Sequence, residues 1–368
     1  MRNPRLALCL FFALSSFTLA VSEVAVVITA PTLTTGGVLQ AMLDEEVASY
    51  TKNIQSIVNE ALTKPLLMQS LADANTENSL LTGFVYLNDR RYVSIVVGGC
   101  ASLVSDTHDI PSLESRLENF QLSSDYSLGA AAQPLCLQLD VSLARLVKGL
   151  GAQASFGYIP PLEYQGFEFS SISAQCGLDW LCLGPVGNKR LVRWDGLEFG
   201  LGLAWSYNSL NTRISTGESS RTLSFRPDGD GPLLPITVTI SLDPQFDATV
   251  EMQSFALPFQ VTTGFTVLGA FSFQIGGGLY PAFGWSDIRL QSVDGTTKIS
   301  VDNYLESLIS QDGYITASGT TDPVYSKVFG YFASGALRLL MGRCSITLPV
   351  IWDYSTGLSA GLNVGVSI

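Results

Sequence analysis

The chain has 368 residues, of which 20 are basic and 32 acidic, so its formal net charge at pH 7 is -12. Charged residues make up 14% of the sequence, against about 25% in soluble globular domains. So few charges disfavour a soluble surface, and an acidic chain with few basic clusters disfavours nucleic acid as a partner.

The first 20 residues have the pattern of a secretory signal peptide. Arg2 and Arg5 form the charged start, Leu6 to Phe17 the apolar centre, and Thr18-Leu19-Ala20 a small-residue cleavage site. The apolar run is short for a membrane span, which favours cleavage over an uncleaved anchor. We expect residues 1–20 to be removed on export.

The one long helical pattern covers residues 36–64, where apolar residues recur at three- and four-residue steps. Pro65 either ends this helix or starts a second short one, Leu66 to Ala72. Because so wide an apolar face must be buried, we expect residues 21–78 to form an N-terminal helical segment that plugs the mouth of a barrel. The alternative is a surface helix without such a role.

From Leu80 the period of the sequence changes from helix to strand, and the rest of the chain, 79–368, is expected to form a β-barrel. A hairpin is predicted at its start, and a polar stretch with a short helix at 105–124. Further strands are expected at 135–143, 150–158, 167–182, 197–207, 235–242, 246–253, 329–339 and 346–350. Polar loops are expected at 211–232 and 286–326.

Residues 252–286 contain no charge, yet proline and glycine interrupt them too often for a membrane helix. Their apolar residues keep a period of two, which predicts two long strands joined by a turn between 262 and 270. In the strand at 197–207, Trp205 and Tyr207 lie together at one end, as in an aromatic girdle at a membrane interface.

The last strand begins at Trp352, and its even positions are apolar while its odd positions are small or polar. This pattern is typical of a transmembrane β-strand with apolar residues outside. It resembles the terminal strand of chains inserted into bacterial outer membranes, and that resemblance implies recognition by the barrel-assembly machinery. The residues that carry it are Leu362, Val364, Val366 and Ile368.

We therefore expect an all-β fold, a transmembrane antiparallel β-barrel of about 12–14 strands, because a sheet inside a bilayer must close on itself. The alternation places a set of polar side chains in the lumen. Such groups usually pair and stiffen the barrel, and a pore-lining or ligand role is the alternative. The lumen-facing candidates are Gln138, Asp140, Glu198, Gln260 and Arg338.

The sequence does not predict an enzyme. Ser359 lies in a G-x-S-x-G match, but only seven residues follow it and none is histidine, so the nucleophile elbow is excluded. The single histidine, His108, lies in a polar stretch, and no phosphate or dinucleotide fingerprint occurs. Neither a cofactor nor a metal site is expected. Five cysteines remain after cleavage, and only Cys176 and Cys182 are close enough in sequence to suggest a disulfide.

A barrel with an N-terminal helical segment that fills it resembles the FadL-like long-chain fatty-acid transporters of outer membranes. The free cysteines and non-aromatic last residue are similar to those of spirochaete-type outer-membrane proteins. This resemblance implies an outer-membrane channel or transporter for hydrophobic small molecules such as long-chain fatty acids. The alternative is a surface adhesin, in which the loops 211–232 and 286–326 bind a partner and the barrel only anchors them.

Overall fold

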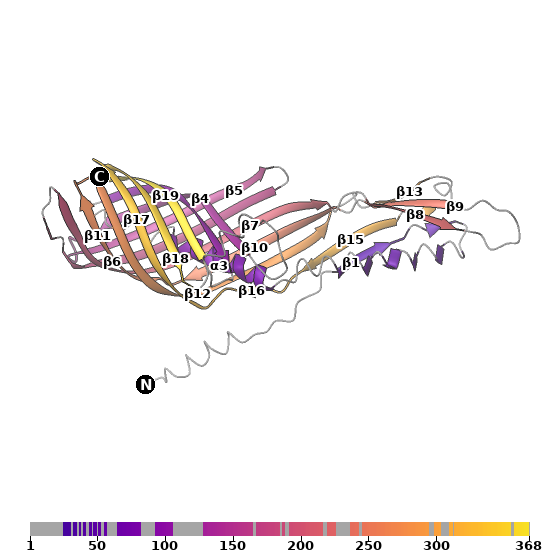
Figure 1. Ribbon diagram of the computed structural model, residues 1–368, viewed down its shortest axis with the longest axis horizontal. Helices are drawn as coiled ribbons and strands as arrows, with labels where there is room; N and C mark the ends of the chain where they lie inside the picture. The colour runs from indigo at the N-terminus through magenta and orange to yellow at the C-terminus, as the bar shows by residue number, and fades with distance from the viewer. Residues whose placement is uncertain are drawn as a thin grey trace, which may run out of the picture.

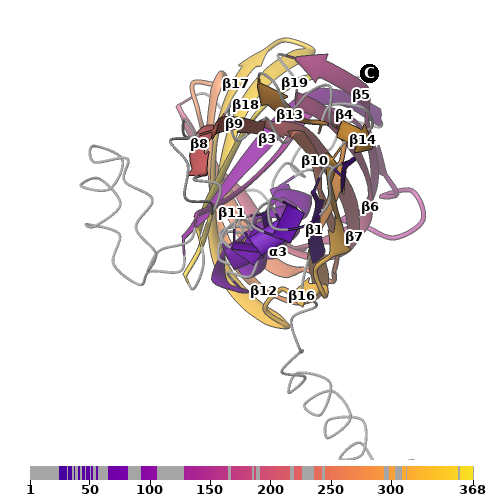
Figure 2. The ribbon, with the colours of Figure 1, turned by 90° about the vertical axis from the view of Figure 1, so that its right-hand side faces the viewer.

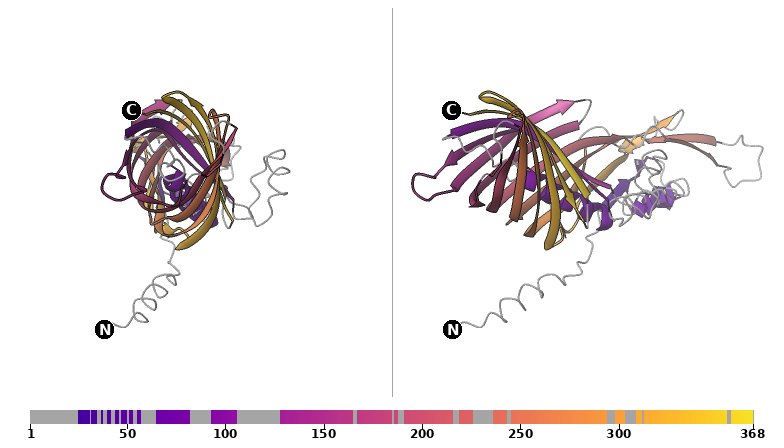
Figure 3. Two further views of the ribbon diagram at one scale, coloured as in Figure 1. Left: turned by 90° about the vertical axis from the view of Figure 1, so that its left-hand side faces the viewer. Right: turned by 60° about the vertical axis from the view of Figure 1, so that its left-hand side comes forward.

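The computed structural model has a closed antiparallel β-barrel at its centre, with strands that project from one end (Figures 1 and 3). The predicted signal peptide, the first arm of the predicted hairpin, most of the stretch 105–124 and Ile368 lie outside the described part of the chain. The structure describes residues 25–30, 32–34, 37, 40–41, 44–45, 47–49, 51–52, 55–56, 65–81, 93–105, 128–164, 167–184, 186–187, 191–215, 219–225, 236–242, 245–293, 298–302, 309–311, 313–354 and 357–367.

Ten strands form the barrel wall, if the consecutive β10 and β11 are taken as one strand, and β19 pairs with β3 to close it. The transmembrane barrel is confirmed, but it has ten strands rather than 12–14. The predicted number assumes that each strand has the roughly 9–11 residues needed to cross a bilayer. Strands such as β7, with 24 residues, are much longer, so fewer of them account for the same length of chain. The wall strands are β3 (Val93–Ser105), β4 (Leu128–Ser142), β5 (Leu150–Tyr164), β6 (Phe167–Leu183), β7 (Val192–Ser215), β10 (Gln245–Ala256), β11 (Phe259–Val267), β12 (Phe271–Ser292), β17 (Phe329–Met341), β18 (Cys344–Asp353) and β19 (Gly357–Ser367).

Side chains alternate between the two faces of the wall as the sequence predicts. On β19, Leu358, Leu362 and Val364 are exposed on the outside, while Ser359 and Asn363 are buried inside. The apolar side chains on the outside suit contact with lipid. Closure of the sheet also pairs the backbone groups of the wall, as a bilayer requires. Aromatic rings gather towards one end of the barrel, where Tyr331 stacks on Tyr354 and Phe283 packs at a tilt against Tyr325, both pairs with centroids 5.4 Å apart.

Beyond that end, β7, β10 and β12 continue into a sheet outside the barrel (Figure 1). The predicted loops 211–232 and 286–326 are thus wrong in part, because strands occupy much of both ranges. A sheet outside the bilayer has no face turned to lipid, so its strands lack the regular apolar alternation that marks a membrane strand in sequence. The added strands are β1 (Ala25–Thr29), β8 (Ser219–Phe225), β9 (Ile236–Leu242), β13 (Lys298–Asp302), β15 (Gly313–Thr320) and β16 (Val324–Tyr325), with the separate pair β2 (Thr32–Leu33) and β14 (Ile309–Gln311).

A single long helix, α3 (Pro65–Leu81), lies inside the barrel (Figure 2). It is longer than the predicted helix Leu66 to Ala72, and it runs three residues past the expected boundary at residue 78. The described positions between 40 and 56 are also helical, but they lie beside the projecting sheet rather than in the lumen. None of the described helices is long and apolar enough to cross a membrane.

The two ends of the barrel differ in their connections. Short turns at 143–149, 184–191, 268–270 and 342–343 all lie at the end where β19 terminates. The long connections lie at the other end, as expected for an outer-membrane barrel. We call these the short-turn end and the long-loop end. The five cysteines after residue 20 are all free, so Cys176 and Cys182 form no disulfide.

Candidate functional site: a plugged lumen with a notched wall

Helix α3 is almost wholly buried over residues 68–80, and its stretch 73–79 is polar except for Ala74. Asn75, Glu77 and Asn78 are each 0% exposed, as is Ser79. A polar helix gains nothing from an apolar core, but it suits a lumen whose wall presents hydroxyl and amide groups. The helix contacts strands from around the barrel, namely β3, β4, β7, β10, β12, β18 and β19. It therefore fills the lumen at its level.

Side chains of the wall bind α3 from several directions. Asn75 Oδ1 accepts hydrogen bonds from Ser206 Oγ at 2.9 Å and from Asn208 Nδ2 at 2.5 Å, both on β7. From the opposite wall, Ser359 Oγ on β19 donates to Glu77 Oε2 at 3.2 Å. Buried polar groups lose much stability when a partner is removed, so these contacts hold α3 in one position.

The start of α3 is held in the same way. Ser286 Oγ on β12 donates to the carbonyl oxygen of Met68 at 2.6 Å. The backbone N–H of Lys327 donates to Asp73 Oδ1 at 2.8 Å. The wall also approaches α3 very closely at Gly129, where a Cβ would collide with the backbone carbonyl of Ser70. Glycine is required there because the two backbones touch.

An apolar layer separates α3 from the short-turn end of the lumen. Leu80, at the end of the helix, packs with Tyr280, Phe332 and Ile351 and with alanines of β7, β10, β12 and β17. Tyr280 Oη donates to Asp353 Oδ2 at 2.7 Å, so the phenol in this layer keeps a partner. The lumen is therefore divided into a polar level around α3, an apolar layer, and a second polar level.

The second polar level contains the side chains predicted to face the lumen. Gln138, Glu198, Gln260 and Arg338 are buried on the inner face, and Asp140 is half-buried. Gln138 Nε2 donates to Asp140 Oδ1 at 2.6 Å. Arg338 Nη2 donates to Ser345 Oγ at 3.2 Å. The strands β11 and β12 separate β7, which carries Glu198, from β17, which carries Arg338. A pore-lining role for the five residues stays a prediction.

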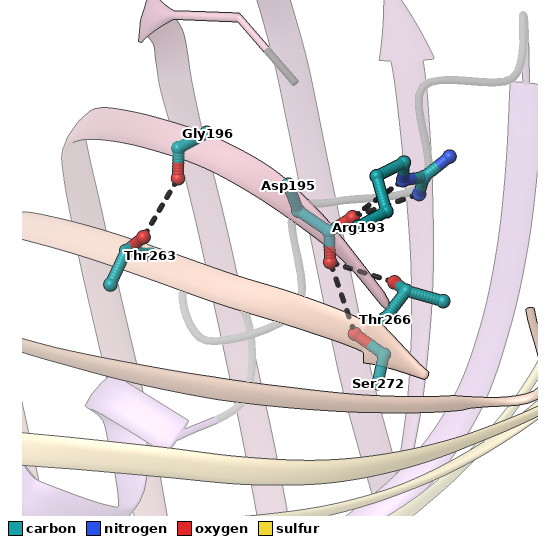
Figure 4. A network of polar contacts seen from close by, with 6 residues as sticks. All are labelled: Arg193, Asp195, Gly196, Thr263, Thr266 and Ser272. Carbon is teal, nitrogen blue, oxygen red and sulfur yellow. Dashed lines mark hydrogen bonds and ion pairs between the residues drawn. The ribbon is translucent and has the colours of Figure 1, made fainter. Parts of the chain in front are cut away.

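A polar network ties β7 to β11 and β12 at the short-turn end (Figure 4). Asp195 is buried, and its Oδ1 pairs with Nε and Nη2 of Arg193, both at 2.9 Å. Its Oδ2 accepts from Thr266 Oγ1 at 2.8 Å and from Ser272 Oγ at 3.5 Å. The pairing of β7 with β11 shifts register beside this network, and Gly196 there has φ +100°. The network fixes the wall where its backbone is irregular.

The wall has a notch where β3 lies between β4 and β19. The β3–β4 register shifts between Gly98 and Cys100. On the lipid side of this bulge is a groove of about 580 Å³, lined also by Leu135, Ala360 and Leu362. On the lumen side is a cavity of about 10 Å³, lined also by Val96, Cys136, Gln138 and Asn363. The same three residues, 98–100, line both hollows.

The notch is linked to the plug through one side chain. Cys100 Sγ lies 3.1 Å from Asn78 Oδ1 of α3, to which it donates. Opposite Gly361, Pro349 on β18 lacks an N–H, and the β18–β19 ladder has no pair between Thr347↔Asn363 and Val350↔Ala360. The barrel is thus less continuously bonded here, next to the helix that closes it. Among the described residues there is no group of three or more acidic, histidine or cysteine side chains that could hold a metal ion.

The sequence was compared with protein families, and the profile described as Lsa36-like matches residues 25–368. The chain belongs to the Lsa36-like family. No curated protein matches it. Among solved structures, this Lsa36-like chain is similar to a Pseudomonas aeruginosa FadL homologue, with 10% identity, TM-score 0.23, and coverage of 82% of this chain and 98% of that one.

Two further similar structures are also barrels of other bacteria. The translocator domain of the autotransporter NalP from Neisseria meningitidis has 9% identity and TM-score 0.26, with 75% of this chain and 88% of that one covered. The toluene transporter TbuX from Ralstonia pickettii has 8% identity and TM-score 0.23, with 76% and 90% covered.

The residues of this Lsa36-like barrel that sequence reasoning missed are those in the second half of α3, beyond the predicted helix Leu66 to Ala72. The run Asp73-Ala74-Asn75-Thr76-Glu77-Asn78 is polar, and an amphipathic pattern does not detect it. One signal of this helix is present in the sequence: a short run that contains amide and carboxylate side chains lies between leucines at both ends. The notch left a weaker signal in the pair Gly98-Gly99, which interrupts a strand pattern.

Proposed function

We propose that this chain is an outer-membrane channel for small hydrophobic molecules, with long-chain fatty acids as the first substrate class to test. Helix α3 closes the lumen, and the notch joins lipid to lumen. The chain reaches the outer membrane after removal of residues 1–20. Leu362 and Val364, which face outward on β19, are part of the motif ending at Ile368 that the barrel-assembly machinery would bind.

The observation that carries the proposal is the pair of hollows that share residues 98–100. A hydrophobic molecule concentrates in the bilayer and so meets the groove first. The groove is lined by apolar side chains, among them Val97, Leu135 and Leu362. The lumen itself is polar at two levels, which disfavours an apolar molecule travelling its full length. A path through the wall avoids that cost.

Uptake of a fluorescent long-chain fatty acid into proteoliposomes tests the proposal. Ala101 and Ala360 lie opposite each other on the outer face and both line the groove. The double variant Ala101→Phe/Ala360→Phe fills the groove from the lipid side, and we expect uptake to fall about tenfold or more. The matched control is Ala154→Phe, an outward-facing alanine on β5 away from the groove, which should keep uptake unchanged.

Two results would contradict this function. Liposomes with the unaltered protein would take up fatty acid no faster than empty liposomes, or the groove-filled variant would transport like the control. Leakage of glucose is measured in parallel, because a rise in it would indicate a lumen opened by damage rather than a route through the wall.

The projecting sheet favours a second candidate function, surface interaction. The strands β8, β13 and β15, which lie in the two ranges first expected to be loops, extend well beyond the barrel. Replacing residues 219–242 by a short turn tests this. Under the interaction function, cells that display the shortened chain lose attachment to partner-coated surfaces while fatty-acid uptake persists. Loss of uptake alone would instead assign the sheet to the channel.

A further inference from the structure

The short-turn end of the barrel carries charge of one sign. The described residues of the four turns include the basic Arg145, Lys148 and Arg343 and no acidic residue, in a chain whose net charge is -12. Arg145, Lys148 and Arg343 are exposed. Arg193, at the first residues of β7, adds a half-exposed guanidinium beside the same turns. We call these four described residues and the turns that hold them the basic rim.

The acidic side chains near the basic rim lie on the inner face of the wall, and one of them pairs with the rim residue Arg193. Asp195 is buried and engaged by Arg193, Thr266 and Ser272. Asp140 accepts hydrogen bonds from Ser94 and Gln138 on the inner face. The outer surface of this end therefore presents positive charge, although the chain as a whole is acidic.

Large apolar side chains stand between these cations. Leu146 is 81% exposed, Leu268 63%, Val186 62% and Leu191 60%, and each lies in one of the four turns. Turns that face only water rarely expose so many large apolar groups together. Basic residues interleaved with exposed apolar ones are the composition that binds at a membrane interface. The rim is also continuous with the lipid-facing belt, because Trp180, which pairs with Leu150 beside the first turn, is exposed on that belt.

We propose that the basic rim binds the phosphate-bearing headgroups of anionic lipids in the leaflet at the short-turn end. Arg145, Lys148, Arg193 and Arg343 contact the phosphates, and Leu146 and Leu268 enter the boundary between headgroups and acyl chains. Charge complementarity selects this occupant, since phosphate is the anion that a bilayer surface offers and guanidinium binds it well. The proposal needs the transmembrane barrel and does not depend on transport.

Lipid selection by the full chain tests this proposal. The full chain, with its other four tryptophans changed to Phe so that Trp180 alone fluoresces, is reconstituted into phosphatidylcholine vesicles that contain brominated phosphatidylglycerol or brominated phosphatidylcholine. Quenching then reports lipid contact at Trp180. Each surface cation contributes a factor of about five to binding of an anionic surface. We expect about a tenfold or greater preference for phosphatidylglycerol at low salt, falling steeply in 0.5 M NaCl as screening shortens the electrostatic range to roughly 4 Å.

The variant Arg145→Gln/Lys148→Gln/Arg343→Gln should reduce this preference to about one. The matched control Arg213→Gln/Arg289→Gln removes exposed cations from the projecting sheet and should keep the preference. Equal quenching by both lipids with the unaltered protein, or a full preference in the rim variant, overturns the proposal. Circular dichroism of each variant shows whether the barrel is folded, and Lys148→Gln alone, which should lower the preference about fivefold, serves if the triple variant misfolds.

Discussion

The two ends of this barrel solve different physical problems with the same strands. At the long-loop end the lumen is filled by α3, the strands leave the bilayer, and charges of both signs pair on the outer face, as Arg213 does with Asp247 at 3.0 Å. At the short-turn end, side chains such as Asp195 link neighbouring strands of the wall, the turns are tight, and their described charges are all basic. One end is therefore filled by a separate element, whereas the other is held together by contacts within the wall itself.

The difference indicates where each end gets its stability. The long-loop end depends on a few contacts with one helix, and these can be lost together. The short-turn end depends on hydrogen-bond networks within the wall, so the loss of one contact there should affect only the neighbouring strands. Substitutions at the two ends should differ in size and in range accordingly.

The largest effect is expected where α3 touches the wall. Gly129→Val places a branched side chain against the Ser70 carbonyl, so α3 must move. We expect the free energy of unfolding to fall by about 3 kcal/mol, with increased leakage of small polar solutes. Urea unfolding in detergent and a liposome leakage assay measure the two. Gly335→Val is the control, since a Cβ there lies 3.7 Å from the Gln274 carbonyl. Equal behaviour of both variants would show that α3 is not held at Gly129.

A moderate and local effect is expected at the short-turn end. Asp195→Asn keeps the shape of the side chain but removes the charge that pairs with Arg193 and accepts from Thr266. The expected cost is about 1–2 kcal/mol, reduced because Arg193 is partly exposed. Hydrogen exchange should rise in β7 and β11 near the network while α3 keeps its protection. The control Asp247→Asn removes an exposed pair in the projecting sheet and should change neither region. A rise in exchange throughout the barrel after Asp195→Asn would break the comparison.

The smallest effect is a pH dependence of the projecting sheet. Asp287 is 8% exposed and lies opposite Glu251, so burial first and then this second carboxylate raise the pKa of Asp287 above its usual value. The folded state then binds more protons than the unfolded state between the usual and the raised pKa, so stability falls as the pH rises through that interval. Asp287→Asn should remove this fall and leave the short-turn end unaffected. Protease resistance of the sheet against pH measures it, and an unchanged pH profile in the variant would refute the assignment.

Much of the wall could be predicted because one bilayer imposes one pattern on every strand. The alternation that points Leu201 outward and Glu198 inward is visible in the sequence, and so is the exposed face of β19. The closed barrel follows from that pattern. The number of strands does not, because strands that continue past the bilayer add residues without adding spans.

The plug could not be identified in the same way. An apolar stripe is the usual sign that a helix is buried, and it favours residues 36–64. In this barrel the buried helix is α3, whose surroundings are Ser206, Asn208 and Ser359, so its burial calls for polar side chains. The notch was also beyond prediction, because it arises from the meeting of β3, β4 and β19, and their alignment is set by barrel closure.

Strand β7 runs without interruption from the short-turn end into the projecting sheet. Its 24 residues span about 80 Å, more than twice the thickness of a bilayer core. A force applied to the outer end of β7 is therefore transmitted along one continuous strand. It loads the hydrogen-bond ladders to β6 and β10 in shear, so that many hydrogen bonds share the load. A partner that binds the outer end of β7 is therefore connected to the membrane through one continuous strand.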